Sequence, residues 1–217
     1  MKPVLSLESL KSESSLFAEA ESTFPEPKLY GVTDGKAVGT YLEHKFRIYL
    51  EDKYSFTLGN SASGIDFPEL NIDMKVTSIK QPQSSCPYKS ARQKIYGLGY
   101  GLLVFVYDKV DDHAARTGRL DMKHTILVDK AQTADYQMTR GILDILSRDG
   151  NQDDLVAFFQ DKNLPVDEIE ANNIAEEVLI NPPLQGYLTI SNALQWRLQY
   201  TRVIQQAGNV AGIHRVW

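Results

Sequence analysis

The sequence has little of what disulfide frameworks and zinc sites require. Its 217 residues include one cysteine, Cys86, and four histidines that stand far apart in the chain. A single thiol cannot form an internal disulfide, and histidines without ligand-like spacing argue against a zinc site. The chain also lacks the G-x-x-x-x-G-K-[ST] loop that cradles nucleotide phosphates and the G-x-S-x-G turn that presents a serine nucleophile. We therefore expect no nucleotide cofactor.

Long hydrophobic runs are absent as well. No apolar run approaches the ~18 residues that a membrane-spanning helix needs. The N-terminal stretch MKPVLSLESLKSESS does not follow the charged-then-apolar pattern of a signal peptide. With 42% hydrophobic and 24% charged residues, the chain has enough apolar material for one full core. These features predict a cytoplasmic protein without a membrane partner.

Acidic residues are missing from two segments, although the net charge of the chain is −5. Residues 74–107 contain five Lys and Arg and no Asp or Glu, and residues 178–217 contain three Arg and no acid. A segment without carboxylates tolerates a polyanion such as a phosphate backbone. Acid-free windows also arise in buried strands, which residues 97–107 resemble, but the charged stretch 75–94 is harder to explain in that way.

Hydrophobic spacing predicts the order of the elements. Apolar residues from Val38 to Leu50 recur on one helical face, with Asp34 or Thr33 as the N-cap. The continuous apolar run LLVFVYDK predicts a strand that is buried on both faces. The elements expected along the chain are a helix over 36–52, a strand over 54–60, a hairpin leading into a strand over 72–77, a helix over 89–97, a strand over 102–109, a polar loop over 108–123, a strand over 124–130, and helices from about 137 onward, ending in a long helix over 191–208.

Strands in the middle of the chain with helices on both sides predict an α/β fold. We expect a mixed central β-sheet flanked by helices. Residues 1–217 are interpreted as a single domain, in which 1–30 form an N-terminal arm, 31–130 form the α/β core, and 131–217 form a mainly helical subregion.

The stretch SGIDFPELNIDMKVTS, residues 63–78, places charged side chains on a strand that leads into the buried sheet. Alternation directs Met74 toward the core and Asp73 and Lys75 toward the opposite face. The turn FPELN would bring Asp66 back toward Asp73. Two converging carboxylates repel each other, and a bound hard cation such as Mg²⁺ relieves that repulsion. A lysine beside them can assist a water molecule.

A third carboxylate is available on the preceding helix. Glu43 lies at the edge of the apolar stripe and should point toward the sheet margin, whereas Glu51, near the helix end, is the less favoured alternative. An Asp-x-Lys pair alone is most often a solvated ion pair worth under about 1 kcal/mol. The combination of Glu43 and Asp66 with Asp73 and Lys75 is far more restrictive.

This combination resembles the PD-(D/E)xK nuclease superfamily, and within it the type II restriction endonucleases. The resemblance covers roughly residues 36–107, as a helix, a three-stranded meander, a further helix and a buried strand. Ile65 stands where the family usually has a proline, and Pro68 follows the first aspartate instead. The short spacing between the two aspartates is also similar to that of mismatch-repair nicking endonucleases.

The resemblance implies a role for each residue of the motif. Asp66 and Asp73 would bind Mg²⁺, and Lys75 would assist the attacking water. Glu43 would complete the metal site. The main-chain carbonyl of Met74 would be a further metal ligand.

Donors suited to phosphates and base edges follow the catalytic strand. They lie in a polar loop and in the expected helix over 89–97. The candidate DNA contacts there are Lys80, Gln81, Gln83, Ser84, Ser85, Lys89, Arg92 and Lys94.

The expected last helix offers a second set of DNA contacts. Gln195, Gln199 and Arg202 fall at i, i+4 and i+7 and would form one stripe. Glutamine can bond adenine and arginine can bond guanine in the major groove. The alternative is a solvated helix face whose opposite side, with Trp196, belongs to the core.

These observations predict a Mg²⁺-dependent, sequence-specific endonuclease that cuts double-stranded DNA as a homodimer in a prokaryotic cytoplasm. Residues 131–217 would then serve DNA recognition or dimerisation. The alternatives are a nicking or repair endonuclease of the same fold and a catalytically inactive DNA-binding module. The intact set of Asp, Asp and Lys argues against the inactive module, because a pure binder has no reason to bury repelling carboxylates.

Overall fold

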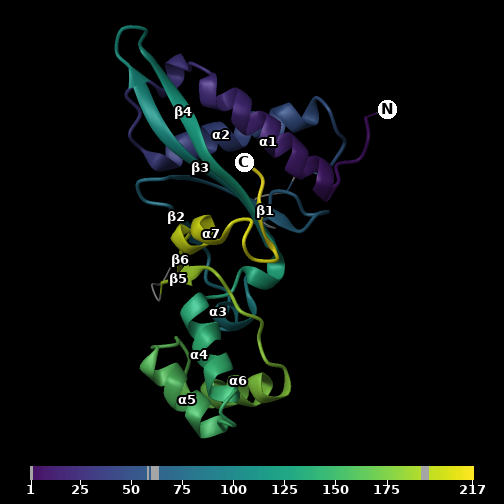
Figure 1. The fold of residues 1–217 in the computed structure, drawn as a ribbon, viewed down its shortest axis with the longest axis vertical. Coiled ribbons are helices and arrows are strands. Elements are labelled where there is room, and N and C mark those ends of the chain that lie inside the picture. The colour runs from purple at the N-terminus through teal and green to yellow at the C-terminus, as the bar shows by residue number, and fades with distance from the viewer. Residues whose placement is uncertain (1, 58, 60–63, 192–195) are drawn as a thin grey trace.

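A mixed β-sheet forms the centre of the protein (Figure 1). The computed structural model describes residues 2–57, 59, 64–191 and 196–217. The strands of this sheet follow the order β1-β3-β4-β7, with β1 parallel to β3 and the other neighbours antiparallel. Its members are β1 (Ile72–Ser78), β3 (Gly101–Asp112), β4 (Thr117–Val128) and β7 (Ile213–Arg215).

A smaller antiparallel sheet lies beside the first. Its order is β2-β6-β5, so a strand from the middle of the chain pairs with two from its last thirty residues. Its members are β2 (Gln83–Cys86), β5 (Thr189–Ile190) and β6 (Trp196–Gln199).

Helices cover the central sheet and form a separate group at one end of the molecule. In Figure 1, α1 and α2 lie beside β3 and β4, whereas α4, α5 and α6 lie at the end opposite the tip of the β3–β4 hairpin. None of the described helices combines the length and the apolar composition that crossing a bilayer requires. The helices are α1 (Leu7–Thr23), α2 (Gly35–Glu51), α3 (Gln93–Tyr96), α4 (Tyr136–Leu146), α5 (Gln152–Asp161), α6 (Glu168–Ile180) and α7 (Thr201–Gln206), with short 3-10 turns over Pro27–Leu29 and Lys130–Gln132.

The strand β3 is buried on both faces, as its continuous apolar run predicts. Leu103 and Phe105 pack into the core beneath α1 and α2. Leu102 and Val104 point the other way, into the core shared with the smaller sheet and Trp196. A third apolar cluster joins α4, α5 and α6. The predicted α/β class with a mixed sheet flanked by helices is therefore confirmed.

The predicted polar loop over 108–123 is wrong. β3 continues to Asp112 and β4 begins at Thr117, so a long hairpin occupies most of this segment. The outer part of β4 is buried on one face only: Leu120 and Met122 belong to the core under α1 and α2, and the residues on either side of each carry charge. The charged residues Asp111 and Asp112 at the end of β3 lie outside that core. The strand predicted over 124–130 is therefore the inner half of β4.

Two shorter predictions also need correction. Between 54 and 57, only Ser55 makes a bridge, with Val4, instead of the predicted strand over 54–60; residues 58 and 60 lie outside the described ranges. The predicted helix over 89–97 is reduced to a single turn, which ends where Gly97 adopts φ +88°. The expected three-stranded meander is absent from the described segments. The chain passes through β2 and α3 between β1 and β3, and β1 and β3 then pair in parallel.

The predicted long helix over 191–208 is wrong in its described part. Trp196 to Gln199 form β6, with alternate residues buried and exposed, and only Thr201 to Gln206 are helical. Trp196, Tyr200 and Val203 are all fully buried, which agrees with the alternative that places Trp196 in the core. Their spacing fits a helix, but the period of two over 196–199 fits the strand that pairs with β2. Gln195 lies outside the described residues.

Candidate active site

The helix α2 positions Glu43 at the edge of the central sheet. The side chain of Asp34 caps its first turn by accepting from the Lys36 amide at 3.0 Å. Leu42 and Phe46 are fully buried in the core that contains Met74 of β1. Because Glu43 follows Leu42 on this face, its carboxylate is carried to the margin of the sheet and is partly buried.

A tight turn brings Asp66 next to β1. Phe67 and Ile72 exchange backbone hydrogen bonds of 2.9 and 3.2 Å, and Asn71 adopts φ +54° between them. The Oδ2 of Asp66 accepts from the Met74 amide at 2.8 Å. This hydrogen bond fixes Asp66, the first aspartate of the motif, to the backbone of Met74. Met74 directly follows Asp73, the second aspartate.

Asp73 and Lys75 form an ion pair on the face of β1 opposite Met74. The Lys75 Nζ lies 2.6 Å from the Asp73 Oδ2, and Asp73 is 3% exposed. Burial raises the pKa of Asp73 to about 6, with the neighbouring Asp66 acting in the same direction and Lys75 opposing it. Burial also favours the neutral form of Lys75, but the Asp73 carboxylate outweighs it and the pKa of Lys75 is raised. Lys75 therefore carries its charge at neutral pH.

Glu43 completes a group of three interacting carboxylates. Burial raises its pKa to about 7, and the charge of Asp66 adds to that rise, whereas Lys75 and Arg47 oppose it. The predicted residues Glu43, Asp66, Asp73 and Lys75 are thus close enough to influence one another's ionisation.

Arg47 is a member of this group that sequence reasoning missed. Its guanidinium donates to the Oδ1 of Asp66, so both oxygens of that carboxylate are engaged. The spacing could have revealed it, because Arg47 stands four residues after Glu43 and therefore on the same helix face.

The donor types of this site suit a hard divalent cation. The two aspartates are each bound by a positive side chain, Arg47 or Lys75. Within the described residues, no three acidic, histidine or cysteine side chains stand ready to share an ion. The raised pKa values of Asp73 and Glu43 show, however, that these cations do not fully offset burial and mutual repulsion. A cation that enters must take oxygens now bound by Arg47 and Lys75.

The predicted DNA contacts are distributed over several environments. Exposed positions are held by Lys80, Gln81, Ser85 and Lys89, and Gln83 is partly exposed. Ser84 points into the smaller sheet, where its Oγ lies 2.5 Å from the hydroxyl of Tyr200. Lys94 is 5% exposed and burial lowers its pKa.

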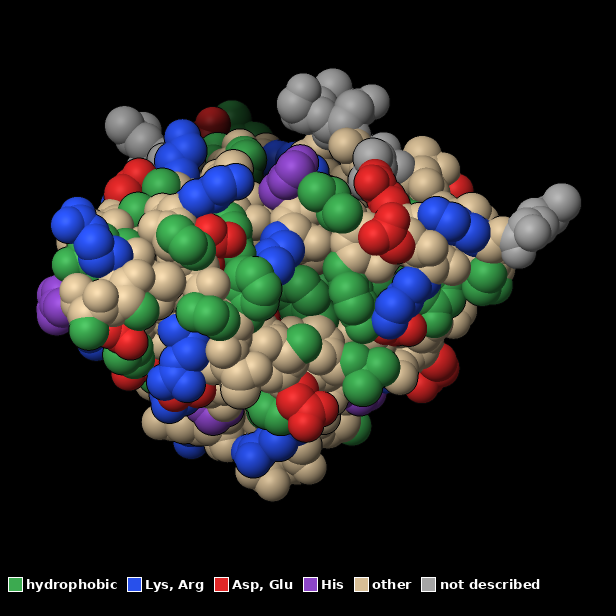
Figure 2. All heavy atoms as spheres, turned by 90° about the horizontal axis from the view of Figure 1, so that it is seen from above, with side chains coloured by type: hydrophobic (Ala, Val, Ile, Leu, Met, Phe, Trp, Pro, Cys, Tyr) green, Lys and Arg blue, Asp and Glu red, His purple; other side chains and the backbone are tan. Residues whose placement is uncertain are grey.

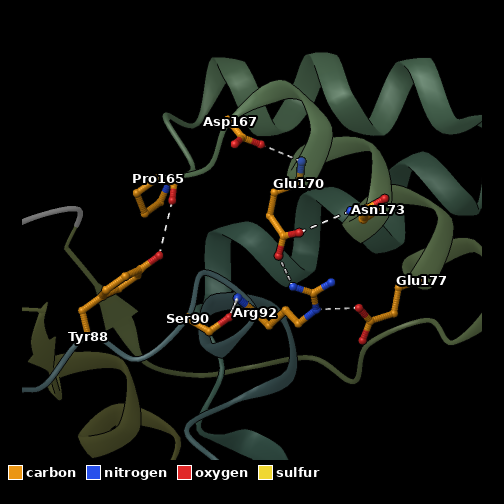
Figure 3. A network of polar contacts seen from close by, with 8 residues as sticks. All are labelled: Tyr88, Ser90, Arg92, Pro165, Asp167, Glu170, Asn173 and Glu177. Atoms are coloured by element: carbon orange, nitrogen blue, oxygen red, sulfur yellow. Dashed lines mark hydrogen bonds and ion pairs between the residues drawn. The ribbon is translucent and has the colours of Figure 1, made fainter.

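Arg92 is held by the helix α6 (Figure 3). Its guanidinium donates to Glu177 at 2.6 Å and to Glu170, and Figure 3 shows it lying between these two carboxylates. Asn173 and Asp167 support the same cluster, because Asn173 contacts the Glu170 carboxylate and Asp167 caps the Glu170 amide. The charge of Arg92 is balanced within the protein.

Two predicted contacts lie at the end of the smaller sheet. Gln199 is exposed on β6, and Arg202 lies on α7 with its guanidinium 3.6 Å from the centroid of the Tyr136 ring. The stripe that the predicted helix would have formed does not exist over residues 196–206, because that segment changes from strand to helix.

Charge is mixed on the face shown in Figure 2. Lys and Arg side chains lie among Asp and Glu side chains there, with hydrophobic side chains between them. This face therefore offers no extended field of one sign.

Comparison with known proteins gives one consistent result. A family model described as Type II restriction enzyme NspV matches residues 4–215. The type II restriction enzyme NspV of Nostoc sp. (strain ATCC 29411 / PCC 7524) is 65% identical over 214 residues, which cover 99% of this chain and 97% of that protein. No solved structure matches the chain significantly.

Proposed function

The chain belongs to the NspV family of type II restriction enzymes, and from that premise we propose that it hydrolyses double-stranded DNA at a specific sequence with the help of Mg²⁺. The observation that carries the proposal is the convergence of Asp66 and Asp73 beside Lys75 on β1. Membership makes the protein a site-specific endonuclease, and the site supplies the chemistry that such an enzyme needs.

The metal ligands proposed are Asp66 and Asp73, with Glu43 and the carbonyl of Met74 as further donors. A divalent cation bound there would neutralise charge on the phosphate and lower the pKa of a water molecule. The turn at 67–72 holds Asp66 in place through the Met74 amide, and burial keeps the Asp73 carboxyl away from bulk water. This set agrees with assignment of the site to the PD-(D/E)xK type.

We assign Lys75 the role of a hydrogen-bond donor rather than a proton acceptor. Its pKa is raised, so the ammonium group remains charged at the pH at which such an enzyme works. A charged Lys75 can orient the attacking water and stabilise negative charge that develops on the phosphate. Asp73 fixes its position through the 2.6 Å ion pair.

The DNA contacts proposed lie mainly on the segment after β1. The positions best suited to phosphates and base edges are the exposed Lys80, Gln81, Ser85 and Lys89 and the partly exposed Gln83. Ser84, Lys94 and Arg92 are engaged or buried, so DNA would have to displace their present contacts. Two sites related by two-fold symmetry would cut both strands in one binding event, and a homodimer would supply them.

The proposal is tested by cleavage of plasmid DNA with Mg²⁺ or with a chelator. The wild-type protein should give discrete fragments only with Mg²⁺. Asp73→Asn should reduce the cleavage rate by about 10³-fold or more, since the metal contributes several kcal/mol to the barrier. Asp121→Asn on β4, where Asp121 binds Lys123 at 2.6 Å, is the matched control and should cut normally.

Binding of the metal has its own readout. Mg²⁺ or Ca²⁺ should raise the melting temperature of the wild-type protein and of Asp121→Asn, but not that of Asp73→Asn. Open circles instead of fragments would indicate a nicking enzyme. Metal-independent cleavage, or an unchanged rate in folded Asp73→Asn, would contradict the proposed site.

A further inference from the structure

A basic cleft lies between the helical end of the molecule and α7. It has a volume of about 560 Å³ and is bounded by α4, α5 and α7. Aromatic and cationic side chains dominate its walls, a combination suited to a phosphate beside a sugar or a base. The walls include Tyr136, Arg140, Asp144, Phe158, Lys162 and Arg202.

Arg202 is the unusual member of this cleft. Its guanidinium stacks on the Tyr136 ring, 3.6 Å from the centroid. Its Nε is buried, and within residues 2–57, 59, 64–191 and 196–217 this nitrogen has no hydrogen-bond partner. Buried donors are almost always paired, so the missing partner leaves this partly exposed guanidinium with unused hydrogen-bonding capacity. A phosphate oxygen is the acceptor that a guanidinium prefers.

The surrounding charges favour an anion. Arg140 donates to the Tyr136 hydroxyl at 2.9 Å, with its guanidinium 5.9 Å from the same ring centroid. Lys162, near Phe158, is paired with Asp161 at 2.8 Å, so its charge is largely balanced. The one acid on the wall, Asp144, is already bound by Arg148 at 2.6 Å. The positive charge in excess is therefore that of Arg140 and Arg202.

The cleft is joined to the catalytic strand by a short path. Tyr200, two residues before Arg202, accepts or donates a 2.5 Å hydrogen bond with Ser84 and donates its amide to the Pro82 carbonyl at 2.8 Å. Pro82 follows β1 by four residues. A group bound by Arg202 therefore has a fixed position relative to Asp73.

We propose that this cleft binds a phosphate of the DNA backbone and so sets the position of the duplex relative to the catalytic strand, an inference that rests on the proposed function. The guanidinium groups of Arg202 and Arg140 bind the phosphate, and their contacts with Tyr136 fix the positions of both groups. The contact carries no sequence information of its own. Arg202 is therefore a positioning residue and not a reader of base edges.

The test measures binding to a duplex that contains the site at which the plasmid is cut, with Ca²⁺ in place of Mg²⁺ and over a range of salt concentrations. Arg202→Gln should weaken binding about tenfold or more at low salt. It should also reduce the slope of log affinity against log salt by about 1, equally for specific and random duplexes. Arg140→Gln, an exposed position that does not endanger folding, should give the same change to a smaller extent.

Two further variants should give the opposite effect and no effect, respectively. Asp144→Asn removes the one negative wall charge and should strengthen binding severalfold. Arg119→Gln removes an exposed arginine on β4 that does not line the cleft, and it should leave the salt slope unchanged. Melting temperatures show that each variant is folded, and if Arg202→Gln is not, Arg140→Gln decides.

Three outcomes would overturn the inference. In the first, Arg202→Gln and Arg140→Gln bind DNA like Arg119→Gln. In the second, Arg202→Gln changes sequence preference instead of weakening all duplexes alike. In the third, the wild-type protein binds inorganic phosphate through Arg202 while the salt slope for DNA is unaffected, which would indicate a site for a free anion. A wild-type protein that binds no DNA at all would refute the proposed function instead.

Discussion

At the scale of single residues, the site is a compromise between carboxylates that repel and two cations that partly compensate. Arg47 binds Asp66 and Lys75 binds Asp73, yet Asp73 and Glu43 keep raised pKa values. Buried carboxylates in this state favour protonation or an additional cation. The unbalanced charge is therefore available for binding the proposed metal.

The titration of Glu43 measures, in the absence of metal, how far Arg47 and Lys75 fail to offset the burial and repulsion of the carboxylates. Its folded-state pKa of about 7 lies above the ordinary value of 4.5, so the folded state binds its proton more tightly. The resulting stabilisation is complete below pH 4.5 and is lost as the pH rises through 7. The melting temperature of wild-type protein, relative to Glu43→Gln, should therefore fall between pH 4.5 and 7 in a chelator.

The control for this measurement is Glu51→Gln, an exposed carboxylate at the end of the same helix. It removes one acid from α2 without touching the cluster around Asp66. A constant difference in melting temperature between wild-type protein and Glu43→Gln across this range would show that Glu43 is not held in the environment described.

At the scale of elements, the position of Glu43 depends on how α2 packs against the sheet. Phe46 is fully buried, and its ring centroid lies 4.9 Å from that of Phe17 and 5.1 Å from that of Phe105. These contacts fix α2 between α1 and β3. A shift of the helix would move Glu43 and Arg47 together, since both are carried by the same segment.

Truncating Phe46 should therefore affect both stability and catalysis. Phe46→Ala should lower the free energy of unfolding in urea by about 3–5 kcal/mol, because it leaves a cavity among aromatic rings. Ile48→Ala removes a side chain that is 45% exposed on the same helix and should cost under about 0.5 kcal/mol. Equal losses in the two variants would mean that α2 is not anchored by this cluster.

The elements that sequence alone predicts well are those with one uninterrupted period. α2 and β3 fall within a few residues of their predicted bounds, because each keeps a single apolar pattern along its length. The segment around Trp196 fits two periods at once, and only pairing with β2 decides between them. In the outer half of the β3–β4 hairpin, Leu120 and Met122 are buried apolar residues two apart, but the charged residues around them hide this short alternation in the sequence.

The candidate site was predictable to a similar degree. The motif gives Asp66, Asp73 and Lys75, and helix periodicity adds Glu43. The same periodicity places Arg47 on the face of Glu43, but its hydrogen bond to Asp66 depends on the approach of α2 to a turn nineteen residues later, which helix spacing alone does not predict.

At the scale of the whole molecule, the helices α4, α5 and α6 must be held in a fixed position relative to the sheets. Arg92, beside α3, reaches across to Glu170 and Glu177 of α6, as Figure 3 shows. All three side chains are about one third exposed, so solvent screens each pair. DNA binding by Arg92 stays a prediction, whereas bracing of α6 is the role that its contacts support.

Arg92→Gln should therefore loosen α6 without unfolding the protein. We expect a loss of about 1 kcal/mol or less per pair in the free energy of unfolding. Amide hydrogen exchange should become faster in α6 and stay unchanged in β3. Lys123→Gln, which breaks the exposed pair with Asp121, is the control and should leave exchange in α6 unaltered. Unchanged exchange in Arg92→Gln would exclude the bracing role.

The turn between Phe67 and Ile72 constrains how the gene for this protein can vary. Four residues separate the two hydrogen-bonded partners, and the Asp66 carboxylate reaches the Met74 amide only at that separation. An inserted or deleted codon would shift one aspartate relative to the other and turn side chains to the wrong face of β1. Natural variation should therefore change the identity of residues 68–70, keep at position 71 a residue that tolerates a positive φ, and preserve the number of residues in the turn. The hairpin tip at Ala114 and Ala115, by contrast, can tolerate changes in length.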